Sequence, residues 1–338
     1  MGSTALKALP IHRARSNNRV RVTRFLAAIG ALSLGGCATA GPPNGGSAIA
    51  GANGIDRRYA TSYESIEARL RPATAKAGKD LYVTDDASSV FLFKIKTYRP
   101  DGAITNGVSD TNSVWVDRSG NVYVANLETA NITEFAPGES APSCTYASGL
   151  IDPVNVTTDS KGNVYVADFN FYAKIGYIDV FPQCTDSIAK QYVIKHGPEG
   201  VAVDARGDIF VSFFNKQKRG AFEEFVHGDS TATLLAASVA SPGGIILDKR
   251  RDIIADDQRG AIFRIPPPYT TASGIVSGLF DPFRVALSED EKTLFSANSG
   301  SGTVTIYAYP SGTLTRTLGS ADGLDGADGV SQNPNDTP

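Results

Sequence analysis

Polar side chains that could bind a ligand occupy matching positions of a repeated sequence pattern. They lie beside a proline or another turn residue at the start of an apolar stretch, and they are Asn112, Asn155, His196, Glu199, Arg284 and Asp328. Amides, carboxylates and a guanidinium can pair with the hydrogen-bonding groups and charges of a ligand. Their equivalent positions predict that they share one axial pocket, provided that the repeats are arranged about an axis.

The repeat itself is built from short strands. Five copies are NSVWVDRSGNVYVA (112–125), PVNVTTDSKGNVYVA (153–167), PEGVAVDARGDIFVS (198–212), PGGIILDKRRDIIA (242–255) and PFRVALSEDEKTLFSA (282–297). The acids Asp117, Asp159, Asp204 and Asp248 recur 42, 45 and 44 residues apart. Alternating apolar residues bounded by Gly, Pro, Asn and Asp indicate strands, and two weaker strand-like stretches follow each pair. Four strands in each repeat are typical of a propeller blade.

A sixth copy is divided between the two ends of the chain. Residues 79–102 supply its second to fourth strands, and ADGVSQNPND (327–336) aligns with PEGVAVDARG (198–207). We therefore expect an all-β fold, a six-bladed propeller of four-stranded blades whose ring is closed by the C-terminal strand. Closure would remove an open sheet edge. The alternative is that this acidic, glycine-rich end forms no strand.

The strings P-x-G-[VI]-x-[VL]-D and G-N-V-Y-V-A-[DN] resemble the NHL repeat and the blades of the senescence-marker/gluconolactonase family over about residues 79–338. The latter resemblance implies a divalent metal such as Ca²⁺, held by Glu199, Asn155 and Asp328 and used to hydrolyse lactones or related esters. The chain departs from that family at Val154 and Gly243, which offer no ligand. It also lacks the family's Asn-Gly motif after proline.

The N-terminal residues have the pattern of an export signal. Five arginines between Arg13 and Arg24 precede a short apolar stretch, Phe25 to Leu34, which is too short for a permanent membrane helix. Leu34-Gly35-Gly36-Cys37 resembles the bacterial lipoprotein signal, which implies lipidation of Cys37 and membrane anchoring. Because Ala38 follows, the resemblance favours the outer membrane, facing the periplasm or the cell surface. The alternative is an ordinary secretory peptide with an incidental cysteine.

Composition divides the rest of the chain into two parts. Residues 38–75 form an expected tether, rich in Gly, Ala, Pro and Ser over its first half, and residues 76–338 form the expected propeller. The net charge of −3 and the pI near 5.7 do not indicate the basic surface that nucleic-acid binding requires.

Cys144 and Cys184 follow the third strand of neighbouring repeats, the second and the third blades. An exported protein experiences an oxidising compartment, so a disulfide between them is expected. It would close a loop of about 40 residues and stabilise the fold by about 3–4 kcal/mol. The alternative is two unpaired thiols.

Other polar positions have a simpler structural interpretation. The four acids that close the first strands are expected to begin hairpin turns, and the ring Asp85, Asn126, Asp168, Phe213, Asp257 and Asn298 is expected to cap turns. Trp115 is expected in the core.

Two functions follow from these observations. The first is a non-catalytic binding or scaffolding module for a protein, peptide or glycan partner, anchored to the membrane by lipid. The alternative is the metal-dependent lactone hydrolase. The repeat is intact, but the set of polar residues that a metal-dependent hydrolase would need is incomplete. This difference favours the binding module.

Overall fold

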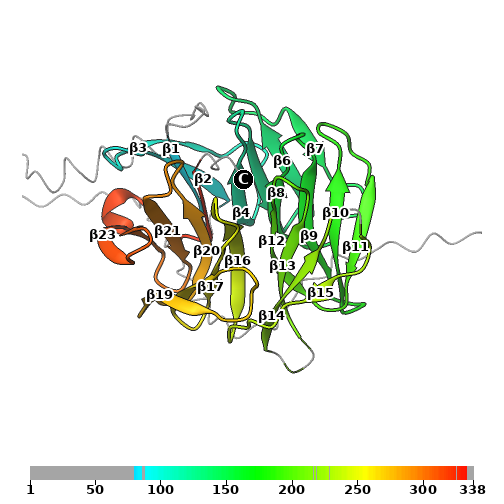
Figure 1. The fold of residues 1–338 in the computed structure, drawn as a ribbon. Coiled ribbons are helices and arrows are strands. Elements are labelled where there is room, and N and C mark those ends of the chain that lie inside the picture. The colour runs from blue at the N-terminus through cyan, green and yellow to red at the C-terminus, as the bar shows by residue number, and fades with distance from the viewer. Residues whose placement is uncertain are drawn as a thin grey trace, which may run out of the picture. The chain divides into compact units, whose positions relative to one another are not determined.

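The computed structural model of the chain describes residues 80–85, 88–215, 217, 219–227, 229–324 and 326–332. The expected signal peptide, the lipidated Cys37 and the tether lie outside the described residues. The described strands form six four-stranded antiparallel sheets arranged as the blades of a propeller (Figure 1). The predicted all-β, six-bladed fold is therefore confirmed.

The chain enters each blade at its innermost strand, with the exception of blade one. Blade one contains β1 (Asp80–Asp85), β2 (Ser89–Lys94) and β3 (Pro100–Ile104); blade two contains β4 (Thr111–Val116), β5 (Val122–Asn126), β6 (Asn131–Phe135) and β7 (Cys144–Tyr146); blade three contains β8 (Pro153–Thr158), β9 (Val164–Asn170), β10 (Ile175–Phe181) and β11 (Lys190–Ile194). Blade four contains β12 (Pro198–Val203), β13 (Ile209–Phe214), β14 (Gly220–Phe225) and β15 (Thr233–Leu234); blade five contains β16 (Pro242–Leu247), β17 (Ile253–Asp257), β18 (Ala261–Ile265) and β19 (Ser273–Ser277); blade six contains β20 (Pro282–Leu287), β21 (Thr293–Asn298), β22 (Thr303–Ala308) and β23 (Thr313–Leu318).

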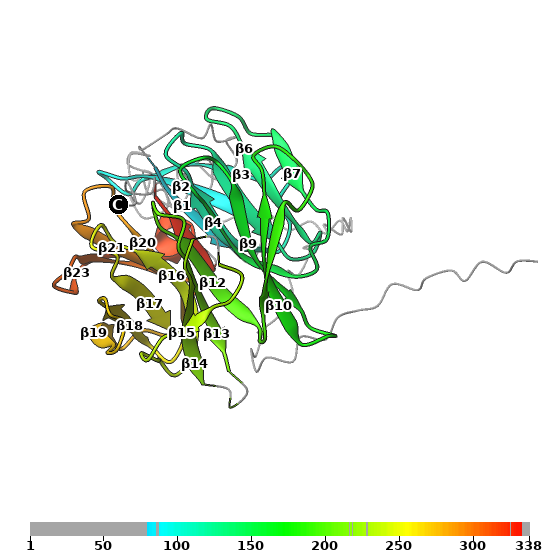
Figure 2. The same ribbon diagram turned by 45° about the vertical axis from the view of Figure 1, so that its right-hand side comes forward.

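The last strand closes the ring as predicted. After a short 3₁₀-helix, η1 (Ser320–Asp322), the chain forms β24 (Gly329–Ser331), which pairs antiparallel with β1. Val330 lies opposite Val83 in this pairing. The red C-terminal strand consequently lies beside the cyan strands of blade one (Figure 2). Blade one thus takes its innermost strand from the other end of the chain.

The core is divided into six clusters, one between each pair of neighbouring blades. Leu81 and Val83 of blade one, for example, pack with Phe295 of blade six, and Val211 of blade four packs with Ile178 of blade three. This arrangement follows from the alternation of apolar residues, because successive side chains of a strand point to opposite faces of its sheet. Both faces of every blade are therefore buried.

The acids that close the first strands begin hairpin turns, as predicted. The Oδ1 atom of Asp117 accepts a hydrogen bond from the backbone N–H of Asn121 at 2.8 Å, and Asp204 accepts one from Asp208 at 2.9 Å. These turns define one end of the axis, which we call the hairpin face. The opposite end, where the innermost strands of blades two to six begin, we call the strand-start face.

Candidate functional site

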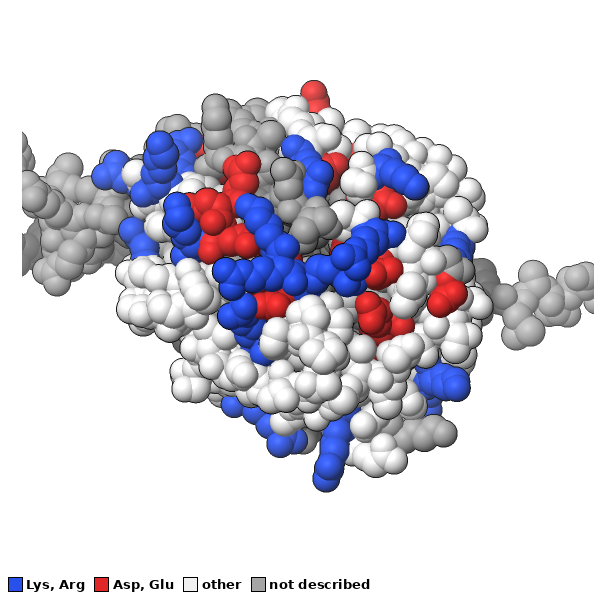
Figure 3. All heavy atoms as spheres, in the orientation of Figure 1, with Lys and Arg blue, Asp and Glu red and all other residues white. Residues whose placement is uncertain are grey.

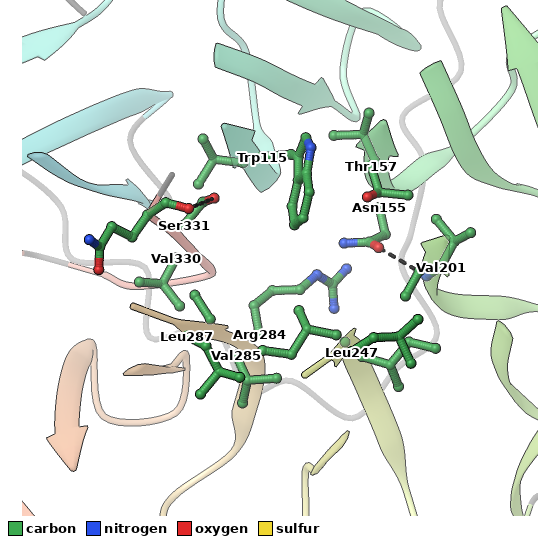
Figure 4. A pocket seen from close by; sticks show the side chains of 18 of the residues that line it. Trp115, Asn155, Thr157, Val201, Leu247, Arg284, Val285, Leu287, Val330 and Ser331 are labelled. Carbon is green, nitrogen blue, oxygen red and sulfur yellow. Dashed lines mark hydrogen bonds between the residues drawn. The ribbon is translucent and has the colours of Figure 1, made fainter. Parts of the chain in front are cut away.

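A narrow channel runs between the innermost strands. Its free volume is about 60 Å³, and blades two to six and β24 all contribute to its lining. The side chains drawn in Figure 4 include Trp115, Asn155, Thr157, Arg284 and Ser331, and most of the others are aliphatic. The channel is therefore a small, largely apolar space with a few polar groups.

Irregular strand pairing positions the first polar residues at the channel. The register between the first and second strands shifts at the start of blades two to six, for example between Pro198 and Gly200 and between Pro282 and Arg284. Proline suits the first position of a strand because it has no N–H to donate to the ladder. A bulge leaves one residue unpaired and redirects its side chain. In blades four and six this residue is Glu199 and Phe283.

Arg284 crosses the axis. Its guanidinium donates from Nη2 to the carbonyl oxygen of Val154 in blade three, which lies opposite blade six in the ring. Nη1 donates to the carbonyl oxygen of Phe283 at 2.7 Å, and the guanidinium lies 3.9 Å from the centre of the Phe283 ring. In Figure 4 the side chain extends to the middle of the channel, below Trp115 and Asn155 in this view. A cation thus occupies the place where an axial ligand would bind.

Asp256 lies near enough to this arginine to feel its charge, and it is completely buried. Burial raises the pKa of its carboxyl group well above the ordinary value, and nearby Glu199 adds to the rise, while Arg284 and the N–H groups of Gly243 and Gly244 oppose it. A Cβ atom on Gly243 would lie 2.2 Å from Asp256 Oδ1, so the bulge of blade five requires glycine here. The other blades hold Ala, Ser or Thr at the position of Asp256.

The structure brings two of the six predicted axial residues into the channel. Asn155 and Arg284 line it, whereas Asn112, His196, Glu199 and Asp328 are not among its described lining residues. The side-chain oxygen of Asn155 accepts a hydrogen bond from the N–H of Val201 at 3.0 Å (Figure 4). Asn155 therefore links blade three to blade four.

His196 stacks on Phe213. Their ring centres are 5.6 Å apart and the rings are 12° from parallel. The residues equivalent to Phe213 in blades two, three and five are Asn126, Asp168 and Asp257. Their side-chain oxygens accept hydrogen bonds from backbone N–H groups of the loop that leads into the blade. Asp168, for example, accepts from the N–H groups of Ile151 and Asp152. This agrees with the turn-capping role expected of Asn126, Asp168 and Asp257. Blade four replaces that polar contact with an aromatic one.

The residues predicted to bind Ca²⁺ do not fit such an ion. The Arg284 guanidinium spans the axis, and a positive charge there repels a divalent cation. Asn155 already uses its oxygen for Val201. Elsewhere among the described residues, Glu134, Cys144 and Cys184 lie close enough to hold a metal, but both cysteines are oxidised. We derive no reaction step from a metal.

Cys144 and Cys184 form a disulfide with a Cα–Cα distance of 5.3 Å. The bond joins β7 in blade two to the loop after β10 in blade three. The backbone N–H of Cys184 also donates to the Tyr146 hydroxyl at 2.9 Å. These contacts cross-link the outer parts of the two blades at the hairpin face.

Sequence reasoning missed part of what surrounds the axis. Trp115 does pack against the core between blades two and three, but it also lines the channel, and its indole N–H donates to Thr158 Oγ1 at 2.9 Å. Asp256 was not singled out. Aligning the repeats would have found it, because a carboxylate replaces small residues there.

Large aromatic side chains are exposed on the strand-start face. Phe171 is 54% exposed and Tyr172 is 72% exposed, both in the turn between β9 and β10 of blade three. Phe171 packs edge-on against Phe169 with ring centres 6.0 Å apart. A Cβ atom on Gly197, next to His196, would lie 3.3 Å from the Phe169 ring. We call Phe169, Phe171, Tyr172, His196 and Phe213 the aromatic patch.

Comparisons with known proteins identify the architecture. No protein-family model and no curated protein matches the sequence. Among the described residues, no helix has the length and apolar character needed to cross a membrane. The NHL and gluconolactonase resemblance stays a prediction.

Solved structures of low sequence identity share the fold. A structure of a nidogen/laminin complex has a TM-score of 0.61 and 15% identity, covering 75% of this chain and 98% of that chain. A hydrazine synthase from Kuenenia stuttgartiensis has a TM-score of 0.57 and 13% identity, covering 79% and 91%. A protein of unknown function from Desulfotomaculum acetoxidans DSM 771 has a TM-score of 0.56 and 12% identity, covering 76% and 100%. At these identities the chain is similar to all three in its β-propeller fold.

Proposed function

We propose that this chain is a lipid-anchored protein of the bacterial envelope whose propeller binds a protein or peptide partner through its strand-start face. The observation that carries the proposal is the aromatic patch. Exposed aromatic residues supported by packed neighbours are characteristic of interface centres, because they bury a large apolar area with little loss of conformational freedom. Phe171 and Tyr172 extend from a turn whose base is held by Phe169.

The departure of blade four from the repeat supports the same surface. The fold requires an Asp or Asn at the position of Phe213 only to cap a loop, yet here a phenylalanine stacks on His196. The chain as a whole carries little net charge. On the face seen in Figure 3, Lys and Arg side chains lie next to Asp and Glu side chains, and the net charge is −3. Apolar side chains of a partner are therefore the better match.

Lipid anchoring is proposed from the sequence. The basic segment, the apolar stretch and Leu34-Gly35-Gly36-Cys37 occur in the order of a lipoprotein signal. Cys37→Ala should abolish fatty-acid labelling and move the protein from the membrane fraction to the soluble fraction. Retention of both the label and the membrane location in that variant would contradict the anchor.

Site-specific crosslinking tests the partner surface. A photoreactive phenylalanine analogue at position 172 should give a discrete crosslinked product in intact cells, and Phe171→Ala should reduce it. The same analogue at Leu314, which is 56% exposed on the outer strand of blade six, is the matched control. Identical products from both positions, or a product at 172 that is insensitive to Phe171→Ala, would overturn the proposal.

The alternative, a divalent-metal-dependent hydrolase of lactones or related esters, has weaker support because Arg284 occupies the axis. It is tested by melting the purified protein with Ca²⁺ and with chelator. A metal held at a hundredfold its dissociation constant should stabilise by about 2.7 kcal/mol. A shift that is lost in Glu199→Ala, together with turnover of a lactone panel, would favour the hydrolase.

A further inference from the structure

A second cavity lies on the hairpin face, between blades two and three. Its free volume is about 170 Å³, larger than that of the axial channel. It is lined by the first hairpin turns of the two blades, residues 117–119 and 158–162, with Trp115 and Gln183 as its remaining walls. Arg118, Ser119, Ser160 and Lys161 are exposed, so the cavity is accessible from solvent.

Gly162 borders the cavity, and a Cβ atom at this position would lie 2.7 Å from Gln183 Oε1. The equivalent of Gly162 in blade five is Arg251, and both residues have left-handed backbone angles, with φ of +83° and +66°. The Arg251 side chain reaches back to blade four and pairs with Asp204 and Asp208 at 2.7 Å and with Glu224 at 3.4 Å. The corresponding residues of blade two are Asp117, Asn121 and Glu134, and no side chain at position 162 reaches them.

Neutral donors satisfy the carboxylates of blade two instead, and one of them, Gln183 Nε2 of blade three, donates to Glu134 Oε1 at 3.5 Å. Asn121 donates from its side-chain amide to Asp117 at 2.8 Å, and the Tyr146 hydroxyl donates to Glu134. The boundary between blades two and three therefore needs no cation at the position that the Arg251 side chain occupies between blades four and five. Gln183 lies against Gly162, and the cavity beside it is open to solvent or to a ligand.

The lining offers both signs of charge and one aromatic plane. Asp117 and Asp159 would repel an anion, and Arg118 and Lys161 would repel a cation. Thr158, Ser119, Ser160 and Gln183 add donors and acceptors. The Trp115 indole is held by its hydrogen bond to Thr158. This combination of balanced polar groups around an aromatic ring suits a neutral molecule with many hydroxyl groups and an apolar face.

We propose that this cavity binds a neutral saccharide unit, the end of a glycan or a free sugar. The hydroxyl groups pair with the turn residues, and the C–H face of the sugar ring packs on Trp115. Gln183 is adjacent to Cys184, whose disulfide to Cys144 and hydrogen bond to Tyr146 fix that wall. A wall held in place before binding reduces the ordering cost of the complex.

Trp115 is the only tryptophan of the chain and lines both this cavity and the axial channel, so its fluorescence responds to either and the variants below assign the response to the cavity. The purified full chain is titrated with glucose, galactose, mannose and N-acetylglucosamine, and separately with inorganic phosphate and with arginine. We expect a saturable change with at least one neutral sugar. Gly162→Arg, which places in the slot the side chain that blade five uses, should weaken that sugar by about tenfold or more.

Two further variants keep the test decisive. Gly138→Arg adds the same charge at another left-handed glycine, φ +91°, whose Cβ would meet nothing within 4 Å, and it should bind the sugar normally. Gln183→Ala removes a polar wall without entering the cavity and should also weaken binding, which covers the case in which Gly162→Arg does not fold. A response to phosphate or arginine alone, no response to any of the four sugars, or a sugar response unchanged in Gly162→Arg and Gln183→Ala would overturn the proposal. The aromatic patch lies on the opposite face, so crosslinking from position 172 is independent of this outcome.

Discussion

Blades two and three meet in a different way from blades four and five, although the same repeat positions face each other at both boundaries. Between blades four and five, Arg251 pairs with three carboxylates and its backbone adopts a left-handed conformation. That conformation is unfavourable for a residue with a Cβ atom, so the ion pairs must offset its cost. Between blades two and three, Gly162 adopts the same conformation without that cost.

The difference shows that the way a buried carboxylate is satisfied decides whether space remains at a blade boundary. A guanidinium from the next blade fills the slot and joins the two blades by charge. Between blades two and three, amides of Asn121 and Gln183 satisfy the carboxylates, and the disulfide adds a covalent link between the blades. One repeat can therefore carry a binding cavity at one boundary and a purely structural contact at another.

Removing the disulfide should produce the largest effect on stability. Cys144→Ser together with Cys184→Ser should lower the free energy of unfolding by about 3–4 kcal/mol, because the unfolded chain regains the freedom of a loop of about 40 residues. Chemical denaturation of the wild type and the double variant measures the loss. Reductant should destabilise the wild type alone, and equal sensitivity of both proteins would contradict a structural role for this bond.

Arg251→Ala should cost about 2–3 kcal/mol, since it leaves Asp204 and Asp208 buried without their cation and the arginine is itself only partly exposed. The measurement is again the free energy of unfolding. Arg250→Ala removes the same charge from the neighbouring exposed position and should change stability little. Equal losses in the two variants would show that the ion pairs do not hold this boundary.

Asn121→Asp should give blade two the carboxylates that blade four has, but without an arginine equivalent to Arg251 to pair with them. The amide that donates to Asp117 would become a second carboxylate, and the two like charges should destabilise the fold by about 1–2 kcal/mol at neutral pH. The double variant with Gly162→Arg should recover part of this loss. Strict additivity of the two substitutions would argue against the equivalence of the two slots.

Glu223 and Glu224 are neighbours in β14, but they face different blades. Glu224 pairs with Arg251 of blade five, whereas burial raises the pKa of Glu223 to about 7 and Lys195 of blade three opposes the rise. The native state therefore holds this proton more tightly than the unfolded chain. Its contribution is fully present below the ordinary pKa of 4.5 and is lost as the pH rises through about 7.

Glu223→Gln should abolish this pH dependence. Between about pH 5 and 8, the stability of the wild type should fall relative to the variant by about 1 kcal/mol, a value reduced for the partial exposure of the side chain. The check is a denaturation series over this range. A constant difference between the two proteins would show that Glu223 does not titrate as described.

Much of the fold could be predicted from the sequence because it depends on local patterns. The alternating strands, the Asp-initiated turns and the alignment of residues 327–336 with 198–207 identified six blades and the closing strand β24. Each of these signals lies within a few residues of the element that it specifies.

The site could be predicted only in part because it depends on what lies across the axis. Bulges at the strand starts redirect side chains, and equivalent positions such as Glu199 and Phe283 are not among the described lining residues of the channel. Arg284 reaches a carbonyl oxygen of the opposite blade, 130 residues away in sequence. The cavity on the hairpin face is bordered by Gly162, and the side chain that is missing there becomes informative only by comparison with the equivalent Arg251.

The accessibility of Trp115 tests most directly whether that missing side chain creates the cavity. Acrylamide quenching of its fluorescence should be clearly weaker in Gly162→Arg than in the wild type, because the new side chain covers the indole, and Gly138→Arg should quench like the wild type. Equal quenching in all three proteins would show that position 162 does not control the cavity, and the comparison between the two blade boundaries would fail.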